Sequence, residues 1–163
     1  MFFLWLIFTL IAAIYFIQNR LAQFDPELNL NGNSRYSLIS QIRELELLKE
    51  TDLSNTIIHF TSNDCSCTQY SVDHKLSIDK IAKRDGFKVI NINLSQDLHT
   101  IIPSTPAILI VDKQQELLYF GPYSVGLACS ESNGYVETVL KNYAKGYHSN
   151  LIISDVKGCY CNL

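Results

Sequence analysis

Two pairs of cysteines carry the chemistry that this sequence could perform. Cys65 and Cys67 stand one residue apart in HFTSNDCSCTQY, and Cys159 and Cys161 repeat the C-x-C spacing in KGCYCNL. A fifth cysteine, Cys129, lies between the two pairs in the sequence. Closely spaced thiols are suited to disulfide exchange or to binding a soft metal ion, and they can also be unlinked small residues.

Backbone geometry limits what Cys65 and Cys67 can do together. Cα atoms two residues apart are about 5.5–7 Å from each other, which overlaps the range found in disulfides. On a helix, however, the two side chains would point about 200° apart. A Cys65–Cys67 bridge would therefore be strained and labile, which suits an exchange catalyst better than a structural cross-link.

The metal alternative uses both C-x-C pairs. The thiolates of Cys65, Cys67, Cys159 and Cys161 are soft ligands for copper, as Cu(I), or for zinc, and Cu(I) tolerates the short spacing better. Such a site requires the apolar segment NLIISDV to dock the C-terminal tail beside the first pair. If it does not dock, the tail is exposed and carries a local disulfide of its own.

The elements around these cysteines alternate between strands and helices. Apolar runs predict strands at 56–60, 87–94, 107–111 and 117–121, and helical spacing predicts helices over 34–50, 67–84 and 136–143. This order indicates an α/β fold, with a four-stranded mixed sheet and helices on both faces. The predicted strand at 56–60 contains His59, which is expected to be a satisfied core residue, and His74 is expected to be a surface or packing residue.

Cys65 directly follows the first predicted strand, at the edge where α/β proteins place their sites. Asp64 is a suitable N-cap for the next helix. Cys65 is therefore expected to lie exposed at the amino-terminal tip of that helix. The unpaired backbone amides there should lower its pKa.

From about residue 54 to residue 144 the chain resembles the thioredoxin superfamily. The resemblance rests on a buried strand that leads through a short loop to Cys65, on the segment STPAILIV, and on LLYFGPYS. It implies a thioredoxin-like fold in which the Thr105-Pro106 peptide bond is cis and faces the active cysteine. An N-terminally membrane-anchored bacterial branch of this superfamily, of unknown function, is also similar.

The resemblance implies thiol–disulfide exchange on protein partners. Cys65 would attack, Cys67 or Cys129 would resolve the mixed disulfide, and Pro106 would present backbone to an extended substrate. The superfamily's motif is C-x-x-C, which places Thr68 at the resolving position and the second thiol one residue early. A non-catalytic scaffold with structural disulfides only is a further alternative.

The N-terminus MFFLWLIFTLIAAIYFI has no charged side chain and predicts a transmembrane anchor over residues 1–18. A spacer and an amphipathic helix are expected over 19–54, the thioredoxin-like domain over 55–146, and a cysteine-containing tail over 147–163. Arg20 alone favours a cytoplasmic domain. The cysteine content instead favours a single-pass protein of a bacterial inner membrane whose globular domain faces the periplasm.

The charge pattern excludes a nucleic-acid binder. The net charge is −3, and the thirteen Lys and Arg residues are scattered among sixteen Asp and Glu residues. A protein that binds DNA or RNA would normally show a basic stripe. The expected partners are therefore protein thiols or disulfides, with the membrane contacted through the N-terminal helix.

Overall fold

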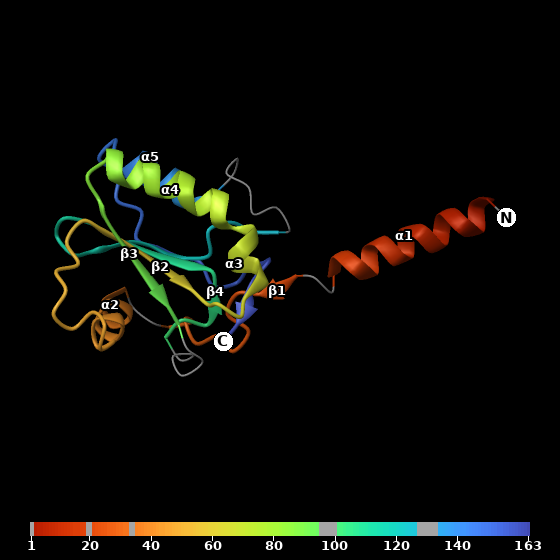
Figure 1. Ribbon diagram of the computed structural model, residues 1–163, viewed down its shortest axis with the longest axis horizontal. Helices are drawn as coiled ribbons and strands as arrows, with labels where there is room; N and C mark the ends of the chain where they lie inside the picture. Colours follow the sequence, from red (N-terminus) through yellow and green to blue (C-terminus); the bar gives the residue numbers. More distant parts are fainter. Residues whose placement is uncertain (1, 19–20, 33–34, 95–100, 127–133) are drawn as a thin grey trace.

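A five-stranded mixed sheet forms the centre of the protein in a computed structural model that describes residues 2–18, 21–32, 35–94, 101–126 and 134–163 (Figure 1). Its order is β3-β2-β5-β6-β7. The strands are β2 (Thr56–Thr61), β3 (Lys88–Asn93), β5 (Ala107–Val111), β6 (Leu117–Gly121) and β7 (Leu151–Ile152). The outer strands β3 and β7 run parallel to their neighbours, whereas the two inner pairings are antiparallel.

The prediction of a four-stranded sheet is wrong because the C-terminal segment adds β7. This strand pairs with β6 through only two residues, Leu151 and Ile152. So short a strand gives no apolar run that sequence could separate from a loop. The four longer strands lie where their β-branched and apolar runs predicted them.

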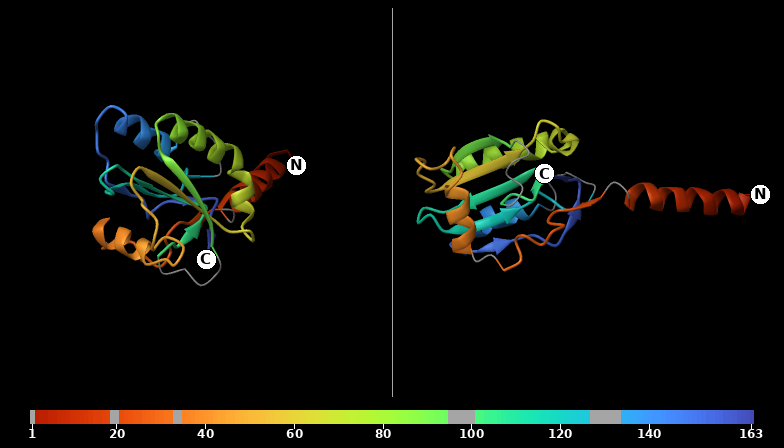
Figure 2. Two further views of the ribbon diagram at one scale, coloured as in Figure 1. Left: turned by 60° about the vertical axis from the view of Figure 1, so that its left-hand side comes forward. Right: turned by 90° about the horizontal axis from the view of Figure 1, so that it is seen from below.

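Helices cover both faces of the sheet. Helices α4 (Val72–Arg84) and α5 (Tyr135–Tyr143) lie side by side on one face, and α2 (Arg35–Arg43) lies on the other (Figures 1 and 2). Successive side chains of β2 point to opposite faces of the sheet, so Ile57 packs with α4 and α5 while Ile58 packs with α2. The sheet interior is therefore apolar on both sides, which its continuous apolar strands require.

Two helices differ from their predicted extents. Helix α2 ends at Arg43, and turns rather than helix follow it up to residue 50. The helix predicted over 67–84 is divided into α3 (Ser66–Tyr70) and α4 by Ser71, whose hydroxyl donates to the carbonyl of Thr68 at 2.9 Å. A serine that bonds to nearby backbone competes with the helical pattern at this point.

Residues 21–32, predicted as a spacer, pack onto the body of the protein. Strand β1 (Ala22–Gln23) pairs antiparallel with β8 (Lys157–Gly158), and Phe24 is completely buried. The buried carboxylate of Asp25 accepts hydrogen bonds from the backbone amides of two following residues, at 3.0 Å and 2.8 Å. This segment is thus part of the folded structure, although the predicted domain boundaries themselves stay a prediction.

The prediction of a transmembrane anchor is wrong. Helix α1 (Phe2–Gln18) has 17 residues, and at about 1.5 Å per residue it is shorter than the roughly 30 Å hydrocarbon layer. No helix in the described part of the chain is both long enough and apolar enough to cross a membrane. The predicted single-pass inner-membrane location and periplasmic orientation depended on this helix and are corrected with it.

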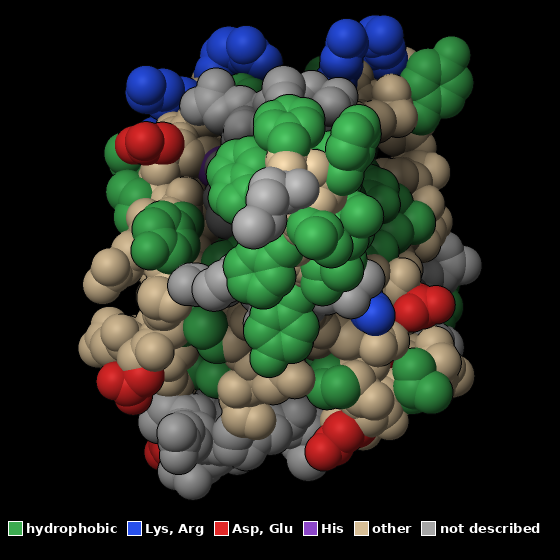
Figure 3. All heavy atoms as spheres, turned by 90° about the vertical axis from the view of Figure 1, so that its right-hand side faces the viewer, with side chains coloured by type: hydrophobic (Ala, Val, Ile, Leu, Met, Phe, Trp, Pro, Cys, Tyr) green, Lys and Arg blue, Asp and Glu red, His purple; other side chains and the backbone are tan. Residues whose placement is uncertain are grey.

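Helix α1 projects away from the sheet (Figure 1) and carries exposed apolar side chains along its length. Figure 3, which views the molecule from the side of this helix, shows them gathered in the middle of that face. Among them Phe3 is 76% exposed and Trp5 is 63% exposed.

The packing of α2 gives a stability prediction. Leu38 is completely buried between α2 and the sheet, whereas Leu47 is 68% exposed. We expect Leu38→Ala to lower the free energy of unfolding by about 2–5 kcal/mol, because it leaves a cavity. Leu47→Ala should change it by less than about 0.5 kcal/mol. Urea denaturation of both variants measures the difference, and equal effects would contradict the packing described.

Candidate functional site: two nested disulfides beside a cis proline

Cys65 lies between the end of β2 and the start of α3. It is the N-cap residue of α3, with extended backbone dihedrals, and its own amide donates to the carbonyl of Ser62 at 3.3 Å. Asp64, the predicted cap, is exposed and precedes it. Cys65 therefore stands just before the helix, and Cys67 stands within its first turn.

The four cysteines of the two C-x-C pairs form two disulfides. Cys65 is bonded to Cys161 and Cys67 to Cys159, with Cα atoms 5.7 Å and 5.5 Å apart. Each C-x-C pair is thus linked to the other pair, and neither is linked within itself. This arrangement avoids the strain expected of a Cys65–Cys67 bridge.

A short pair of strands holds the end of the chain at this place. Strand β9 (Cys161–Asn162) pairs antiparallel with β4 (Ser104–Thr105), so that Cys161 lies opposite Thr105. The next peptide bond, Thr105-Pro106, is cis. Cys65 Sγ lies 3.4 Å from the carbonyl oxygen of Thr105, so the predicted proximity of Cys65 to this bond agrees with the structure.

The predicted exposure of Cys65 is wrong. Its residue is 1% exposed and Cys67 is 8% exposed, because the C-terminal segment covers the start of α3. Cys159 and Cys161, on the covering segment, are partly exposed. Sequence alone placed both C-x-C pairs as candidates, but it did not indicate which one lies on top.

A buried polar network lies behind the disulfides. Pro106, Tyr123 and Cys159 line the same small cavity, of about 10 Å³. The hydroxyl of Tyr123 lies 2.7 Å from His59 Nδ1, and His59 Nε2 lies 2.9 Å from a carboxylate oxygen of Asp79. Tyr123 and Asp79 were not predicted from sequence, because neither belongs to a motif and only the fold brings them together.

The pKa values in this network fix its protonation. Burial is the main cause that lowers the pKa of His59 to about 4, and Lys75 lowers it further while Asp79 opposes the shift. Burial also raises the pKa of the Tyr123 phenol well above its usual range. At neutral pH His59 is therefore a neutral imidazole that donates a hydrogen bond from Nε2 to Asp79 and accepts one from the Tyr123 hydroxyl at Nδ1. The prediction of a satisfied core histidine is confirmed.

Two further histidines pair with carboxylates. His74, predicted as a surface or packing residue, is buried and lies 2.6 Å from Glu137 of α5. His148 lies 2.6 Å from Asp112, whose other carboxylate oxygen accepts two backbone amides of the β5–β6 turn. The second nitrogen of His74, Nδ1, is buried and has no hydrogen-bonding partner among the described residues.

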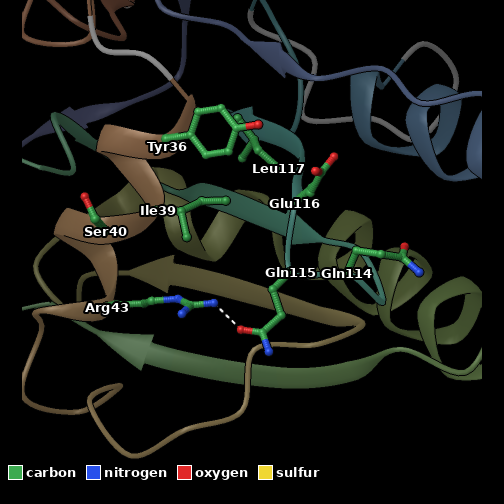
Figure 4. A pocket seen from close by; sticks show the side chains of 8 residues that line it. All are labelled: Tyr36, Ile39, Ser40, Arg43, Gln114, Gln115, Glu116 and Leu117. Atoms are coloured by element: carbon green, nitrogen blue, oxygen red, sulfur yellow. Dashed lines mark hydrogen bonds between the residues drawn. The ribbon is translucent and has the colours of Figure 1, made fainter.

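A larger cavity, of about 390 Å³, lies between α2 and the β5–β6 turn (Figure 4). Arg43 donates a hydrogen bond to Gln115 at its mouth, and Ile39 and Leu117 form apolar walls. It shares no lining residue with the disulfides. The Ser40 hydroxyl on its wall donates to the carbonyl of Ser37 at 2.9 Å and not to Glu116, so the cysteine cluster is the stronger candidate site.

The structure brings together six of the seven residues proposed from sequence. These are Cys65, Cys67, Thr105, Pro106, Cys159 and Cys161. Cys129, proposed as a resolving thiol, lies outside the described residues, and its role stays a prediction. Tyr160 was missed, although an aromatic residue between two cysteines could have indicated that the tail docks.

Comparisons with known proteins add a family but no activity. Residues 37–163 match the family described as Domain of unknown function (DUF6436). A comparison with curated proteins gives no match. Among solved structures, a hypothetical protein from Sinorhizobium meliloti is similar, with 15% sequence identity, a TM-score of 0.47, and coverage of 71% of this chain and 82% of that one.

The two nested disulfides predict non-additive stability. Cys65–Cys161 and Cys67–Cys159 span 96 and 92 residues, so either one alone closes a long loop that stabilises the fold by about 5 kcal/mol. With one in place, the other closes only a ring formed by residues 65–67 and 159–161, which adds about 2 kcal/mol. We expect each paired Cys→Ser double variant to lose about 2 kcal/mol and the quadruple variant about 7 kcal/mol.

Denaturant unfolding under non-reducing conditions measures these losses. The double variants are Cys65→Ser/Cys161→Ser and Cys67→Ser/Cys159→Ser, which leave no unpaired partner behind. Additive losses would contradict two disulfides that both join residues 65–67 to residues 159–161. Digestion and mass mapping of the unmodified protein provide the control for the pairing itself.

The buried His59 predicts a pH dependence of stability. Its pKa is about 4 in the folded protein and about 6.5 when unfolded, so between these values the unfolded chain binds more protons. Stability should therefore fall as the pH is lowered from about 6.5 to about 4, by about 3 kcal/mol over the full range. His59→Gln removes this contribution. Unfolding curves at pH 7.0, 5.5 and 4.5 should show a smaller loss in the variant, and parallel profiles would refute the assignment.

Proposed function

The chain belongs to the DUF6436 family, and we propose that this member exchanges thiols and disulfides with protein partners at the Cys65–Cys161 disulfide. The observation that carries the proposal is the convergence of both C-x-C pairs beside the cis Thr105-Pro106 bond. A disulfide between chain segments that meet only in the folded state can open without breaking the sheet. It therefore provides an oxidising equivalent whose Cys161 side is partly exposed. The Thr105-Pro106 backbone expected to present itself to a substrate is itself buried and covered by β9, so the partner would meet Cys161 first.

The exchange proceeds by two displacements. A thiolate of a dithiol partner attacks one sulfur of the Cys65–Cys161 disulfide, forming a mixed disulfide and releasing the other sulfur as a thiolate. The partner's second thiolate then attacks the mixed disulfide and releases the remaining cysteine. The partner gains a disulfide and loses two electrons and two protons, and Cys65 and Cys161 become thiols. The reverse sequence reduces a partner disulfide.

Access favours Cys161 as the sulfur that meets the partner. Cys161 is partly exposed, whereas Cys65 is 1% exposed beneath it. The position of attack in an exchange depends on which sulfur can be reached. Cys65 then acts as the resolving thiol, in place of the attacking role expected from sequence.

The resemblance to the thioredoxin superfamily supports exchange chemistry. Cys65 follows β2 at the start of a helix, and the cis Pro106 lies beside it, as the resemblance implies. The difference lies in the second sulfur, which comes from the C-terminal segment instead of the same helix. A non-catalytic scaffold is the alternative, and only trapping of a partner separates the two.

The proposal predicts distinct trapped species. Cys65→Ser should hold a partner as a mixed disulfide on Cys161, because the resolving thiol is gone. The probe is a synthetic peptide that carries a single activated disulfide, and intact mass with digestion locates the adduct. Cys161→Ser should form the adduct on Cys65 at least tenfold more slowly, since that sulfur is more buried.

The matched control is Cys67→Ser/Cys159→Ser, which keeps the Cys65–Cys161 disulfide and should oxidise a dithiol peptide as the unmodified protein does. Faster trapping in Cys161→Ser would restore Cys65 as the attacking residue. A Cys65→Ser/Cys161→Ser variant that oxidises the peptide at an unchanged rate would end the proposal for this disulfide.

A further inference from the structure

The C-terminal arm, defined here as residues 150–163, is attached to the body by much more than its two disulfides. Backbone pairing holds it at three places: β7 beside β6, β8 beside β1, and β9 beside β4. The amide of Cys159 also donates to the carbonyl of Gly126 at 3.2 Å, between the second and third of these pairings. The arm therefore has hydrogen-bonded partners along its length that do not depend on sulfur.

Side-chain packing holds the arm between its two cysteines. Tyr160 is 7% exposed and meets Phe24 edge to face, with ring centroids 5.3 Å apart. Its hydroxyl donates to the carbonyl of Ser124 at 2.7 Å. Gly158 makes room for this ring, because a Cβ at that position would lie 2.5 Å from it. None of these contacts involves sulfur, so we expect them to keep the arm docked when the disulfides are reduced.

The sulfurs themselves are clustered. Those of Cys65, Cys67 and Cys161 all lie within 4.8 Å of one another, and the sulfur of Cys159 is bonded to that of Cys67. Two equivalents of a dithiol reductant convert both disulfides to thiols, each disulfide taking up two electrons and two protons. In a four-thiolate zinc site the sulfurs are about 3.8 Å apart, as follows from Zn–S bonds of about 2.3 Å in a tetrahedron. The sulfurs of Cys65, Cys67 and Cys161, all within 4.8 Å of one another, are therefore already close to this spacing.

The surroundings suit thiolates better than neutral disulfide sulfur. The hydroxyl of Thr105, opposite Cys161, is buried and has no hydrogen-bonding partner among the described residues. A buried donor without an acceptor is costly, and a thiolate is a much better acceptor than a disulfide. The buried positions of Cys65 and Cys67 also exclude water from two of the ligands.

We propose that the reduced protein holds one thiophilic d10 metal ion among Cys65, Cys67, Cys159 and Cys161. Thiolates select Zn²⁺ and Cu(I) over harder ions. Zn²⁺ would take all four sulfurs and displace their protons, whereas Cu(I) is satisfied by the three sulfurs that already lie within 4.8 Å of one another. Disulfide formation closes the site, since the bonded sulfurs are no longer thiolates.

The experiment compares reduced and oxidised full-length protein in a Cys129→Ser background, which removes the fifth thiol from the count. The protein is reduced, separated from reductant without oxygen, and titrated with Zn²⁺ alone or with Cu(I) alone, each against a chromophoric chelator. We expect one equivalent of metal per reduced chain and none per oxidised chain. Bound metal should also protect the thiols from alkylation in the unmodified protein, which requires no variant to fold.

Single variants separate the two ions. Cys65→Ser should lose binding of both, and Cys159→Ser should lose Zn²⁺ but keep Cu(I). Retention of both ions by Cys65→Ser, equal uptake by oxidised protein, or no uptake by reduced protein would each overturn the proposal. Retention of Zn²⁺ by Cys159→Ser would overturn the four-sulfur site.

The outcome is independent of the exchange reaction. Cys67→Ser/Cys159→Ser keeps the disulfide proposed for exchange but lacks two metal ligands. If this variant loses Zn²⁺ binding but keeps exchange, the result supports the two proposals separately. If the unmodified protein binds metal but performs no exchange, only the exchange proposal is refuted.

Discussion

The docking of the C-terminal arm across the start of α3 is the contact on which the site depends. The arm completes the sheet at β7, covers β4 with β9, and carries the sulfurs that meet Cys65 and Cys67. Without it, β6 would present an unpaired edge and Phe24 would lose its packing against Tyr160. The candidate site and the packing of Phe24 and β6 therefore depend on the same fourteen-residue segment, 150–163.

Sequence was sufficient where an element has a strong local pattern. The strands β2, β3, β5 and β6 and the helix α5 follow apolar runs or helical spacing, and all lie close to their predicted positions. Sequence failed where local preference and tertiary context disagree. The two-residue strands have no pattern of their own. Leu45 and Leu48, after Arg43, are buried although they lie in turns, and their spacing is the same as it would be in a helix.

The site was predictable in its parts and not in its assembly. The repeated C-x-C spacing and the Thr105-Pro106 dipeptide marked the right residues, because each has a chemical meaning by itself. The pairing of Cys65 with Cys161 and of Cys67 with Cys159 was not predictable. It depends on the direction in which the arm docks, and the contacts of Tyr160 fix that direction. His59 stands six residues before Cys65 in the sequence, but its link to the site passes through Tyr123, which only the fold supplies.

The two nested disulfides also determine how far the folded chain can be stretched. Tension applied at the two ends of the chain passes through Cys65 and Cys161 and bypasses the 96 residues of separation between them. At about 3.4 Å per extended residue, the oxidised protein hides about 300 Å of contour length that the reduced protein releases. The oxidation state of two bonds thus sets the mechanical compliance of the molecule. Strands β3, β5, β6 and β7 lie between Cys65 and Cys161 in the chain and are shielded from load only in the oxidised state, whereas β2 precedes Cys65 and carries load in both states.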